Sequence, residues 1–262
     1  MPMSSETVLL KEASGIGEII LNRPKQRNAL NEEMWKALPA AINHHNENSK
    51  ISVIVIHGGE NGHFAAGADI KEFTRVYANH ENGSKYHKLI AYCLDTIYES
   101  KKPTIAAISG SCVGGGVALA TACDIRIADQ SAKFAVTPAK LGFVYPPDET
   151  EKLINVIGPS RAKMMIFSGA LYDVDFAFRI GLVDEIATER AYQSAVELAS
   201  VLVTNSQWSL QHTKLMVHSF IGSKDQSTTR QAIFKDTIEN SDFKEGVNAF
   251  IQKRSPVFKA LK

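Results

Sequence analysis

The stretch KKPTIAAISGSCVGGGVALATACDIRIA (101–128) decides the fold. Its first apolar run, Thr104–Ile108, is rich in β-forming residues, and its second apolar run is Ile125–Ala128. Between these runs, three consecutive glycines (114–116) precede small residues that continue to Cys123. This pattern predicts a strand, a glycine turn, a buried helix and a second strand.

The glycine triplet is the first candidate for a functional site. Glycine has no Cβ, so a ligand or another backbone can approach its main chain closely. A helix N-terminus also presents unpaired N–H groups and a partial positive charge, which suit an anion that forms during a reaction. A phosphate cradle and a plain packing crossover remain alternatives, because glycine also marks ordinary turns. No Lys-Ser/Thr pair follows the glycines and the G-x-G-x-x-G pattern is absent, which excludes a P-loop and a dinucleotide fingerprint.

Outside this stretch, strand patterns alternate with helix patterns up to about Ile186, and only helix patterns follow. Ser52–His57 is a nearly continuous β-branched run, which is typical of a buried parallel strand. Asn31 precedes apolar residues at helical spacing, so we expect it to cap that helix. The expected elements are strands at 8–10, 16–21, 52–57, 104–108, 125–128, 133–136 and 181–184, and helices at 31–42, near 69, and at 85–100, 148–157, 161–168, 174–180, 190–203, 208–220, 225–240 and 243–253. Together they predict an α/β core over residues 1–200 and a helical region over residues 201–262.

The composition argues against several classes of protein. The chain has 262 residues, a net charge of +1 and scattered basic residues, so we expect no nucleic-acid partner. Residues 1–7 are polar and no apolar run is long enough to span a bilayer, so we expect no signal peptide and no membrane partner. Three cysteines without C-x-x-C spacing favour a reducing, cytoplasmic setting. His44 and His45 are adjacent and would diverge on a helix, so we expect no metal site.

Six segments, in this order, resemble the crotonase superfamily, which is the superfamily of enoyl-CoA hydratases and isomerases. They are NRPKQRNALN (22–31), FAAGADIKEF (64–73), KPTIAAISGSCVGGGVALATACDIRIA (102–128), LGFVYPP (141–147), FRIGLVDEI (178–186) and EGVNAFIQKRSPVF (245–258). The resemblance implies an α/β spiral of ββα units with a C-terminal helical trimerisation region, and a homotrimer or a dimer of trimers. It implies an acyl-CoA thioester as substrate, with coenzyme A entering as part of that substrate and no separate cofactor.

The resemblance also assigns site residues. It places two backbone N–H donors for the thioester oxygen on Ala66 and Gly115. Chemistry beside a thioester carbonyl builds negative charge on its oxygen, and one fixed donor aimed at that oxygen is worth roughly 3–4 kcal/mol. The residues expected along the coenzyme A path are Arg23, Lys25, Arg27, Ala29, Ala68, Asp69 and Ile70. The three cations also fit a solvated loop, and Asp69 also fits a helix cap, which is the interpretation we favour.

The sequence departs from the pattern of a hydratase of this superfamily. Such a hydratase uses two glutamates as acid and base, and the corresponding positions here hold Ala118 and Pro138. Replacements are expected in the loop after Gly142 and the following helix start. The candidates for an acid/base role are Tyr145, Asp148 and Glu149. An acidic pair at a helix N-terminus also complements the helix dipole without catalysis, and Asp148 is expected to cap that helix.

Two hypotheses follow from different classes. The first is an acyl-CoA enzyme that stabilises a thioester enolate and performs isomerisation, hydration or another lyase step with an unusual acid/base. The second is an acyl-CoA binding or scaffold protein that kept the fold and lost its acids. Helical spacing alone leaves open whether Glu72, Tyr86 and His87 reach the acyl group.

Overall fold

The computed structural model describes residues 6–59, 62–221 and 226–258. Its centre is a six-stranded sheet of order β1-β2-β3-β4-β6-β9, and a second sheet has the order β5-β7-β8. In the large sheet, the hairpin β1–β2 is antiparallel and every further pair of neighbours is parallel. The strands are β1 (Val8–Ala13), β2 (Ile16–Leu21), β3 (Val53–His57), β4 (Thr104–Ile108), β5 (Ser111–Val113), β6 (Ile125–Ala128), β7 (Lys133–Ala135), β8 (Tyr172–Asp173) and β9 (Glu185–Ile186).

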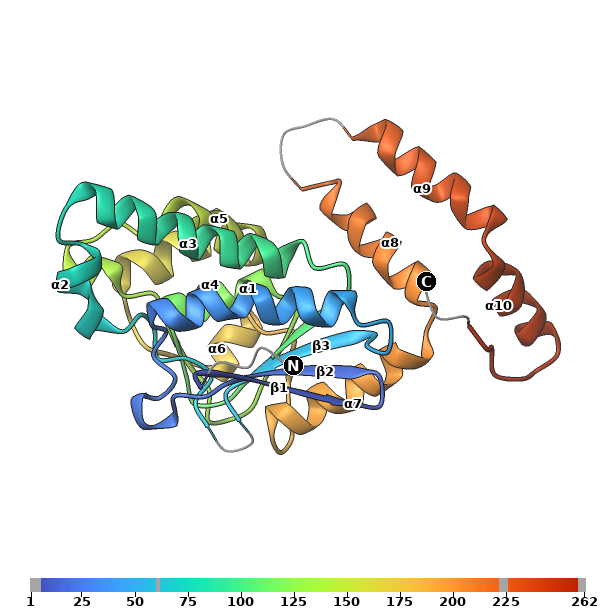
Figure 1. Cartoon of the computed structure of the whole chain (residues 1–262), viewed down its shortest axis with the longest axis horizontal. Coiled ribbons are helices and arrows are strands. Elements are labelled where there is room, and N and C mark those ends of the chain that lie inside the picture. The colour runs from blue at the N-terminus through green and yellow to red at the C-terminus, as the bar shows by residue number, and fades with distance from the viewer. Residues whose placement is uncertain (1–5, 60–61, 222–225, 259–262) are drawn as a thin grey trace.

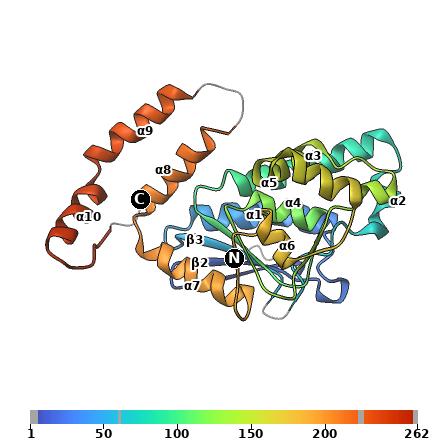
Figure 2. The ribbon, with the colours of Figure 1, turned by 180° about the vertical axis from the view of Figure 1, so that it is seen from behind.

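Helices cover both faces of the large sheet (Figures 1 and 2). The helices are α1 (Glu32–Glu47), α2 (Phe73–Val76), α3 (His80–Tyr98), α4 (Gly115–Ala122), α5 (Pro147–Ser168), α6 (Val174–Arg179), α7 (Ala191–Thr204), α8 (Gln207–His218), α9 (Ser227–Glu239) and α10 (Ser241–Ile251). On one face, α1 contacts β1 and β2 and packs beside α3. On the other face, the small side chains of Ala191, Ala195 and Ala199 let α7 lie close to β3 and β4.

The stretch that decides the fold has the predicted order. Thr104–Ile108 and Ile125–Ala128 are adjacent parallel strands, and the helix α4 lies between them in the chain. Asn31 caps α1 as expected, because its side-chain oxygen accepts a hydrogen bond from the Met34 N–H at 3.0 Å. On one face of the sheet, Ile54 and Ile56 of β3 and Ala106 and Ile108 of β4 join the buried residues of α4 in one apolar core, and the alternate residues of both strands join a second core under α7.

Some element predictions are wrong. Residues 181–184 form a turn, and the strand β9 begins only at Glu185. Leu182 and Val183 are apolar because their side chains pack into the core, and not because they belong to a strand. The short strands β5 and β8 carry too few residues to show an alternating pattern. Asp148 does not cap α5, since the cap position holds Pro146 and Asp148 lies in the first helical turn. By contrast, the two helices predicted at 148–157 and 161–168 are both present: they are the two parts of α5, separated by the non-helical backbone of Gly158 at φ +76°.

The helices α9 and α10 stand away from the core, whereas α8 contacts it through the ion pair Lys214–Asp124 and the stacking of His218 on Tyr98 (Figure 1). All three helices expose large apolar side chains, namely Leu215, Val217, Phe234, Ile238, Phe243, Val247, Phe250 and Ile251. The predicted boundary between residues 200 and 201 falls inside α7, which itself packs on the sheet.

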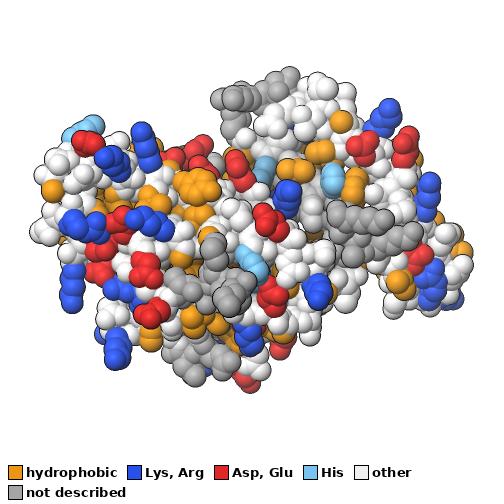
Figure 3. Space-filling model, in the orientation of Figure 1, with side chains coloured by type: hydrophobic (Ala, Val, Ile, Leu, Met, Phe, Trp, Pro, Cys, Tyr) orange, Lys and Arg blue, Asp and Glu red, His pale blue; other side chains and the backbone are white. Residues whose placement is uncertain are grey.

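The surface carries charged side chains of both signs, which agrees with the net charge of +1. On the face drawn in Figure 3, basic and acidic side chains are interspersed rather than gathered into a patch of one sign. Within residues 6–59, 62–221 and 226–258, no helix is long and apolar enough to cross a membrane.

Candidate active site

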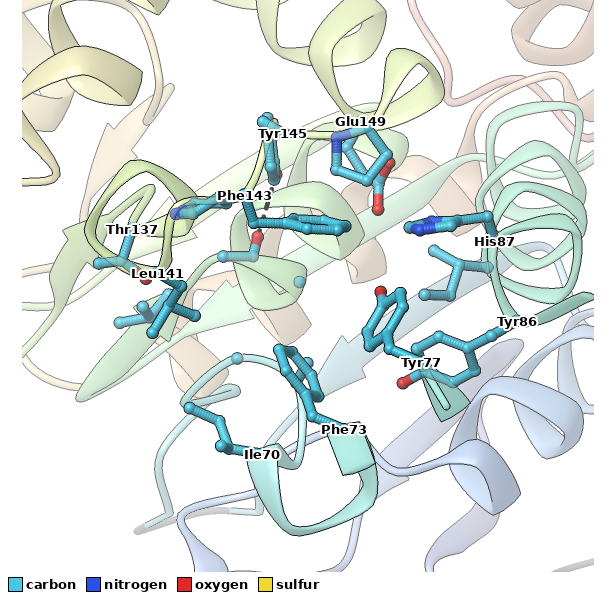
Figure 4. Close-up of a pocket in the computed structure, with 18 of the residues that line it drawn as sticks. Ile70, Phe73, Tyr77, Tyr86, His87, Thr137, Leu141, Phe143, Tyr145 and Glu149 are labelled. Carbon is cyan, nitrogen blue, oxygen red and sulfur yellow. Dashed lines mark hydrogen bonds between the residues drawn. The ribbon is translucent and has the colours of Figure 1, made fainter. Parts of the chain in front are cut away.

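A pocket lies where the turn at residues 66–70, the helices α2 and α3, the start of α4 and the segment 137–149 meet (Figure 4). Its volume is about 110 Å³, below the roughly 300–1,000 Å³ of sites that enclose a whole drug-sized ligand. The two turns that the sequence singled out both contribute to its lining, through residues 66–68 and residues 114–115. The pocket therefore has the size for a short acyl group, next to the backbone that the sequence singled out.

The structure corrects the first backbone donor. The N–H of Ala66 donates to the carbonyl oxygen of Arg27 at 3.0 Å, so it is not available to a substrate. The next part of this turn pairs with Leu30. The Leu30 N–H donates to the Gly67 carbonyl oxygen at 2.7 Å, and the Asp69 N–H donates to the Leu30 carbonyl oxygen at 2.9 Å.

The residue bracketed by those two bonds is Ala68, which forms a parallel bridge with Leu30. In such a pairing the bracketed residue turns its own N–H to the opposite side. Within the described part of the chain this N–H has no hydrogen-bond partner, and Ala68 lines the pocket. The prediction of Ala66 as a donor is thus wrong, and Ala68 holds the free N–H group.

The second backbone donor is on Gly115, the first residue of α4. Gly114 precedes it with φ at +50°, a conformation that glycine adopts easily, and its N–H donates to Ala135 at 2.8 Å. The Gly115 N–H belongs to the first helical turn, where no intrahelical acceptor exists, and none is present elsewhere among the described residues. Gly116 allows the close approach of this turn, because a Cβ there would lie 2.5 Å from the Ala65 carbonyl oxygen.

Tyr145 supports the Gly114–Gly115 peptide from behind. Its hydroxyl donates to the carbonyl oxygen of Gly114 at 3.1 Å, and that carbonyl belongs to the same peptide unit as the Gly115 N–H. The Ala118 N–H donates to the same oxygen at 3.0 Å. Tyr145 is 5% exposed, and burial raises the pKa of its phenol well above the usual value. The side chain is therefore a neutral hydrogen-bond donor at physiological pH.

Glu149 is the carboxyl group that reaches the pocket. It lies in the first turn of α5, and its carboxylate points into the cavity opposite Tyr77 and His87 (Figure 4). Burial raises the pKa of Glu149 from 4.5 to about 7, and the nearby charge of Asp148 acts in the same direction. A carboxyl group with this pKa can both take up and release a proton near neutral pH.

The other acid/base candidates lie elsewhere. Asp148 is half-buried and faces a neighbouring groove that also contacts Tyr77 and His87. Ala118 is buried in α4, and Pro138 is part of the pocket wall. Among the described residues, Glu149 is the only aspartate or glutamate in the lining of this pocket.

Aromatic rings form the outer wall of the pocket, and sequence reasoning missed several of them. The ring of Tyr77 lies 5.1 Å from Phe73, 5.9 Å from Tyr86 and 5.4 Å from Phe143, measured between centroids. His87 stacks on Phe143 at 5.8 Å, so Tyr86 and His87 both belong to the site. The spacing of Phe73 and Tyr77 on one helical face was a signal for this wall. Burial raises the pKa of Tyr77 to about 12.

Glu72, the remaining open candidate, lies outside the pocket lining. Its carboxylate accepts the Glu32 N–H at 2.7 Å and pairs with Arg75 at 3.0 Å. These contacts hold the short helix α2 against the start of α1.

The residues expected along the coenzyme A path divide into two groups. Arg23 is already engaged, because its guanidinium pairs with Asp69 at 2.8 Å and donates to the Ala29 carbonyl oxygen. Asp69 also accepts the Lys71 N–H at 3.1 Å, which confirms that it caps the following short helix.

The other group is open to a ligand. Lys25 and Arg27 are exposed, and their side chains have no hydrogen-bond partner in the part of the chain that the structure describes. Ala68 and Ile70 line the pocket, and Ile70 is 61% exposed at its edge. Lys25 and Arg27 thus belong to the polar loop, and Ala68 and Ile70 belong to the pocket.

Comparisons with known proteins identify the family of the chain. The family model for enoyl-CoA hydratase/isomerase matches residues 11–261. A methylglutaconyl-CoA hydratase of mouse mitochondria is 33% identical over 260 residues, which cover 96% of this chain and 82% of that protein. A crotonyl-CoA hydratase of Syntrophomonas wolfei is 29% identical and covers 98% of this chain and 99% of its own.

Solved structures match equally well. A crystal structure of an enoyl-CoA hydratase/isomerase family protein from Hyphomonas neptunium has a TM-score of 0.93 and 42% identity, covering 97% of this chain and 98% of that one. An enoyl-CoA hydratase/carnitine racemase from Magnetospirillum magneticum has a TM-score of 0.94 and 31% identity, covering 98% and 97%. These matches confirm the crotonase fold that the sequence resembled. The chain therefore belongs to the enoyl-CoA hydratase/isomerase family.

Proposed function

We propose that this protein is an enoyl-CoA isomerase, which moves a carbon–carbon double bond of an acyl-CoA thioester. The observation that carries the proposal is Glu149, the single carboxyl group among the described residues that line the pocket, whose pKa burial raises to about 7. Hydration needs an acid and a base to place water and move a proton, whereas a shift of a double bond needs one group that removes a proton and returns it elsewhere.

The backbone donors stabilise the intermediate. When Glu149 removes a proton from C2 of a 3-enoyl thioester, the electron pair of that C–H bond delocalises onto the thioester oxygen. Within residues 6–59, 62–221 and 226–258 the N–H groups of Ala68 and Gly115 have no acceptor, so they are available to that oxygen. Each such donor contributes roughly 3–4 kcal/mol to the transition state, because the apolar site keeps competing water away.

Glu149 completes the reaction with the proton that it took. The protonated carboxyl group gives this proton to C4, the double bond forms between C2 and C3, and Glu149 returns to its carboxylate form. The product is a 2-enoyl thioester with the same atoms as the substrate, so no water or external acid is consumed. The rings of Phe73, Tyr77 and Phe143 enclose the carbon chain and limit the entry of water, which would otherwise compete for the enolate.

Tyr145 has an indirect role in this scheme. A hydrogen bond to a peptide carbonyl polarises the peptide, which makes its N–H a stronger donor. Since the Tyr145 hydroxyl bonds the Gly114 carbonyl, it strengthens the Gly115 N–H instead of meeting the substrate. Tyr145 is therefore a positioning residue, and Asp148 has no part in the proton transfer.

The substrate is a short acyl-CoA. The small pocket volume supports a short acyl group, and the free cations Lys25 and Arg27 are suited to the phosphates of coenzyme A. Arg23 instead shapes the loop through Asp69. No further cofactor is needed, because the thioester itself accepts the electron pair.

A turnover screen tests the proposal. The purified protein is given a 3-enoyl-CoA, a dienoyl-CoA, crotonyl-CoA and methylmalonyl-CoA, and the binding of each is recorded in parallel. We expect turnover of the 3-enoyl thioester. Binding of several thioesters without turnover of any would support the scaffold hypothesis instead.

Hydration is the second candidate function, because several relatives are named as hydratases. In that case a water held by other groups would replace the missing acid beside Glu149. Rapid hydration of crotonyl-CoA in the same screen would favour this candidate over isomerisation.

We also propose that the protein is a homotrimer or a dimer of trimers in the cytoplasm. The exposed apolar side chains of α8, α9 and α10 need a partner surface, and a second copy of the chain offers the same residues. Sedimentation equilibrium checks the assembly. A monomer at micromolar concentration would contradict it.

A further inference from the structure

We propose that Glu12, His44 and His45 bind a divalent transition-metal ion, for which Zn²⁺ is the best chemical match. The site lies at the end of the β1–β2 hairpin, against the C-terminal part of α1. Trp35, near the other end of the same helix, lines the acyl pocket. The inference is independent of the proposed isomerase reaction.

The two histidines do not diverge as the sequence suggested. Their ring centroids are 5.4 Å apart, and both rings reach Glu12. His44 Nε2 lies 3.0 Å from Glu12 Oε1, and His45 Nδ1 lies 3.4 Å from the same oxygen. With metal–ligand bonds near 2.0–2.1 Å, tetrahedral geometry places neighbouring ligand atoms about 3.4 Å apart. The two distances to Glu12 are close to this spacing, and the ligand atoms of all three groups lie within 4.8 Å of one another.

The tautomer of His45 is the strongest argument. His45 Nε2 lies 3.2 Å from the backbone oxygen of Glu18, an acceptor, so this nitrogen carries the hydrogen. In a neutral ring Nδ1 is then an unprotonated acceptor. This buried Nδ1 makes no hydrogen bond, yet it faces the Glu12 carboxylate, which is a second acceptor. A cation between them would satisfy both groups.

The burial of His45 isolates this nitrogen from other partners. The His45 side chain is fully buried, so solvent does not reach its Nδ1. Lys102, which packs nearby, donates to the carbonyl oxygens of His45 and Asn48 instead. Among the described residues, no protein donor therefore satisfies His45 Nδ1.

Outer contacts orient the ligands as in known metal sites. A histidine ligand usually donates its second ring N–H to a backbone oxygen or a carboxylate, as His45 does to Glu18. The other oxygen of Glu12 accepts the Asn48 side-chain N–H at 2.9 Å, which fixes the carboxylate plane. His44 and Glu12 are partly exposed, so an ion has a path from solvent, and a water molecule can occupy the fourth position.

Calorimetric titration of the tag-free, chelator-treated protein with ZnCl₂ tests the site. The variants are Glu12→Gln, which keeps the side-chain shape, and His44→Ala; both positions are partly exposed, so the fold should be retained. His80→Ala removes an exposed histidine from another helix and serves as the matched control. We expect one equivalent of Zn²⁺ to bind, an affinity at least about tenfold weaker in both site variants, and no change in His80→Ala.

Two readouts make the result decisive. Co²⁺ gives a tetrahedral absorption spectrum if it takes the same ligands, and Zn²⁺ should raise the Tm of the wild type but not of Glu12→Gln. The absence of saturable Zn²⁺ binding, or binding that both site variants retain unchanged, would overturn the proposal.

Discussion

The two walls of the acyl pocket are built from different parts of the chain. One wall is backbone, with the N–H groups of Ala68 and Gly115 held by a parallel bridge and a glycine turn. The opposite wall is made of side chains, with Glu149 among the rings of Tyr77, His87 and Phe143. In the proposed mechanism, the backbone wall fixes where negative charge develops and would serve any thioester enolate. The side-chain wall would decide which proton moves, and hence which reaction follows.

Glu149→Gln should have the largest effect, because it removes the group that carries the proton and keeps the shape of the side chain. We expect kcat for a 3-enoyl-CoA to fall by about 10²–10⁴-fold, with a smaller change in KM. Asp148→Asn, one residue earlier on the same helical turn, is the matched control and should leave kcat within about twofold. Equal losses in both variants would mean that the charge of the helix start matters and not proton transfer.

Gly115→Leu tests the backbone wall. The larger side chain would meet Trp35 and Leu30 and displace the thioester oxygen from the N–H donor, so kcat/KM should fall by about 10²–10³-fold. Gly116→Ala is the comparison variant. Its Cβ would lie 2.5 Å from the Ala65 carbonyl oxygen, so we expect its main effect to be a lower Tm. Normal turnover in a folded Gly115→Leu protein would remove Gly115 from the mechanism.

Tyr145→Phe should have a moderate effect, about tenfold on kcat, because it weakens a donor without removing it. The readout specific to this role is the carbonyl stretch of a bound thioester, which infrared difference spectroscopy records. We expect this stretch to shift back toward its value in water while KM stays the same. Tyr172→Phe, at the second sheet, is the control. A change in Tm with an unaltered carbonyl stretch would leave Tyr145 as a packing residue only.

The smallest effect concerns pH. Because burial raises the pKa of Glu149 from 4.5 to about 7, the folded protein binds more protons than the unfolded chain between these values. The free energy of unfolding that this group contributes therefore falls as pH rises through about 7. Over the same range kcat/KM should rise, since the carboxylate is the active base. Glu149→Gln should exceed the wild type in Tm at pH 8, and the difference should disappear at pH 5; the same difference at both values would contradict the assignment.

Sequence reasoning predicted the layers of the fold well, because long apolar patterns such as Thr104–Ile108 carry a strong signal. It also found the two turns that line the pocket. The absence of the two hydratase glutamates at Ala118 and Pro138 stays a prediction from the resemblance. The choice between Ala66 and Ala68 was not predictable, because it depends on which N–H pairs with Arg27 and Leu30 across the loop.

The choice among Tyr145, Asp148 and Glu149 needed the structure for a similar reason. Neighbouring residues on one helical turn point in different directions, and only the packing of α5 shows that Glu149 faces the cavity while Asp148 faces a groove. Likewise, Glu12 contacts both His44 and His45 because β1 lies beside the C-terminal part of α1. Contacts between distant segments therefore account for most of what the sequence could not predict.

One experiment tests most directly whether Glu149, in the side-chain wall, carries the proton. The wild type and Glu149→Gln are assayed side by side for isomerisation of a 3-enoyl-CoA and for hydration of crotonyl-CoA at pH 8. We predict rapid isomerisation by the wild type, hydration at least about 100-fold slower, and loss of isomerisation in the variant. Hydration as fast as isomerisation, or an active Glu149→Gln protein, would contradict the assignment of Glu149 as the single proton carrier.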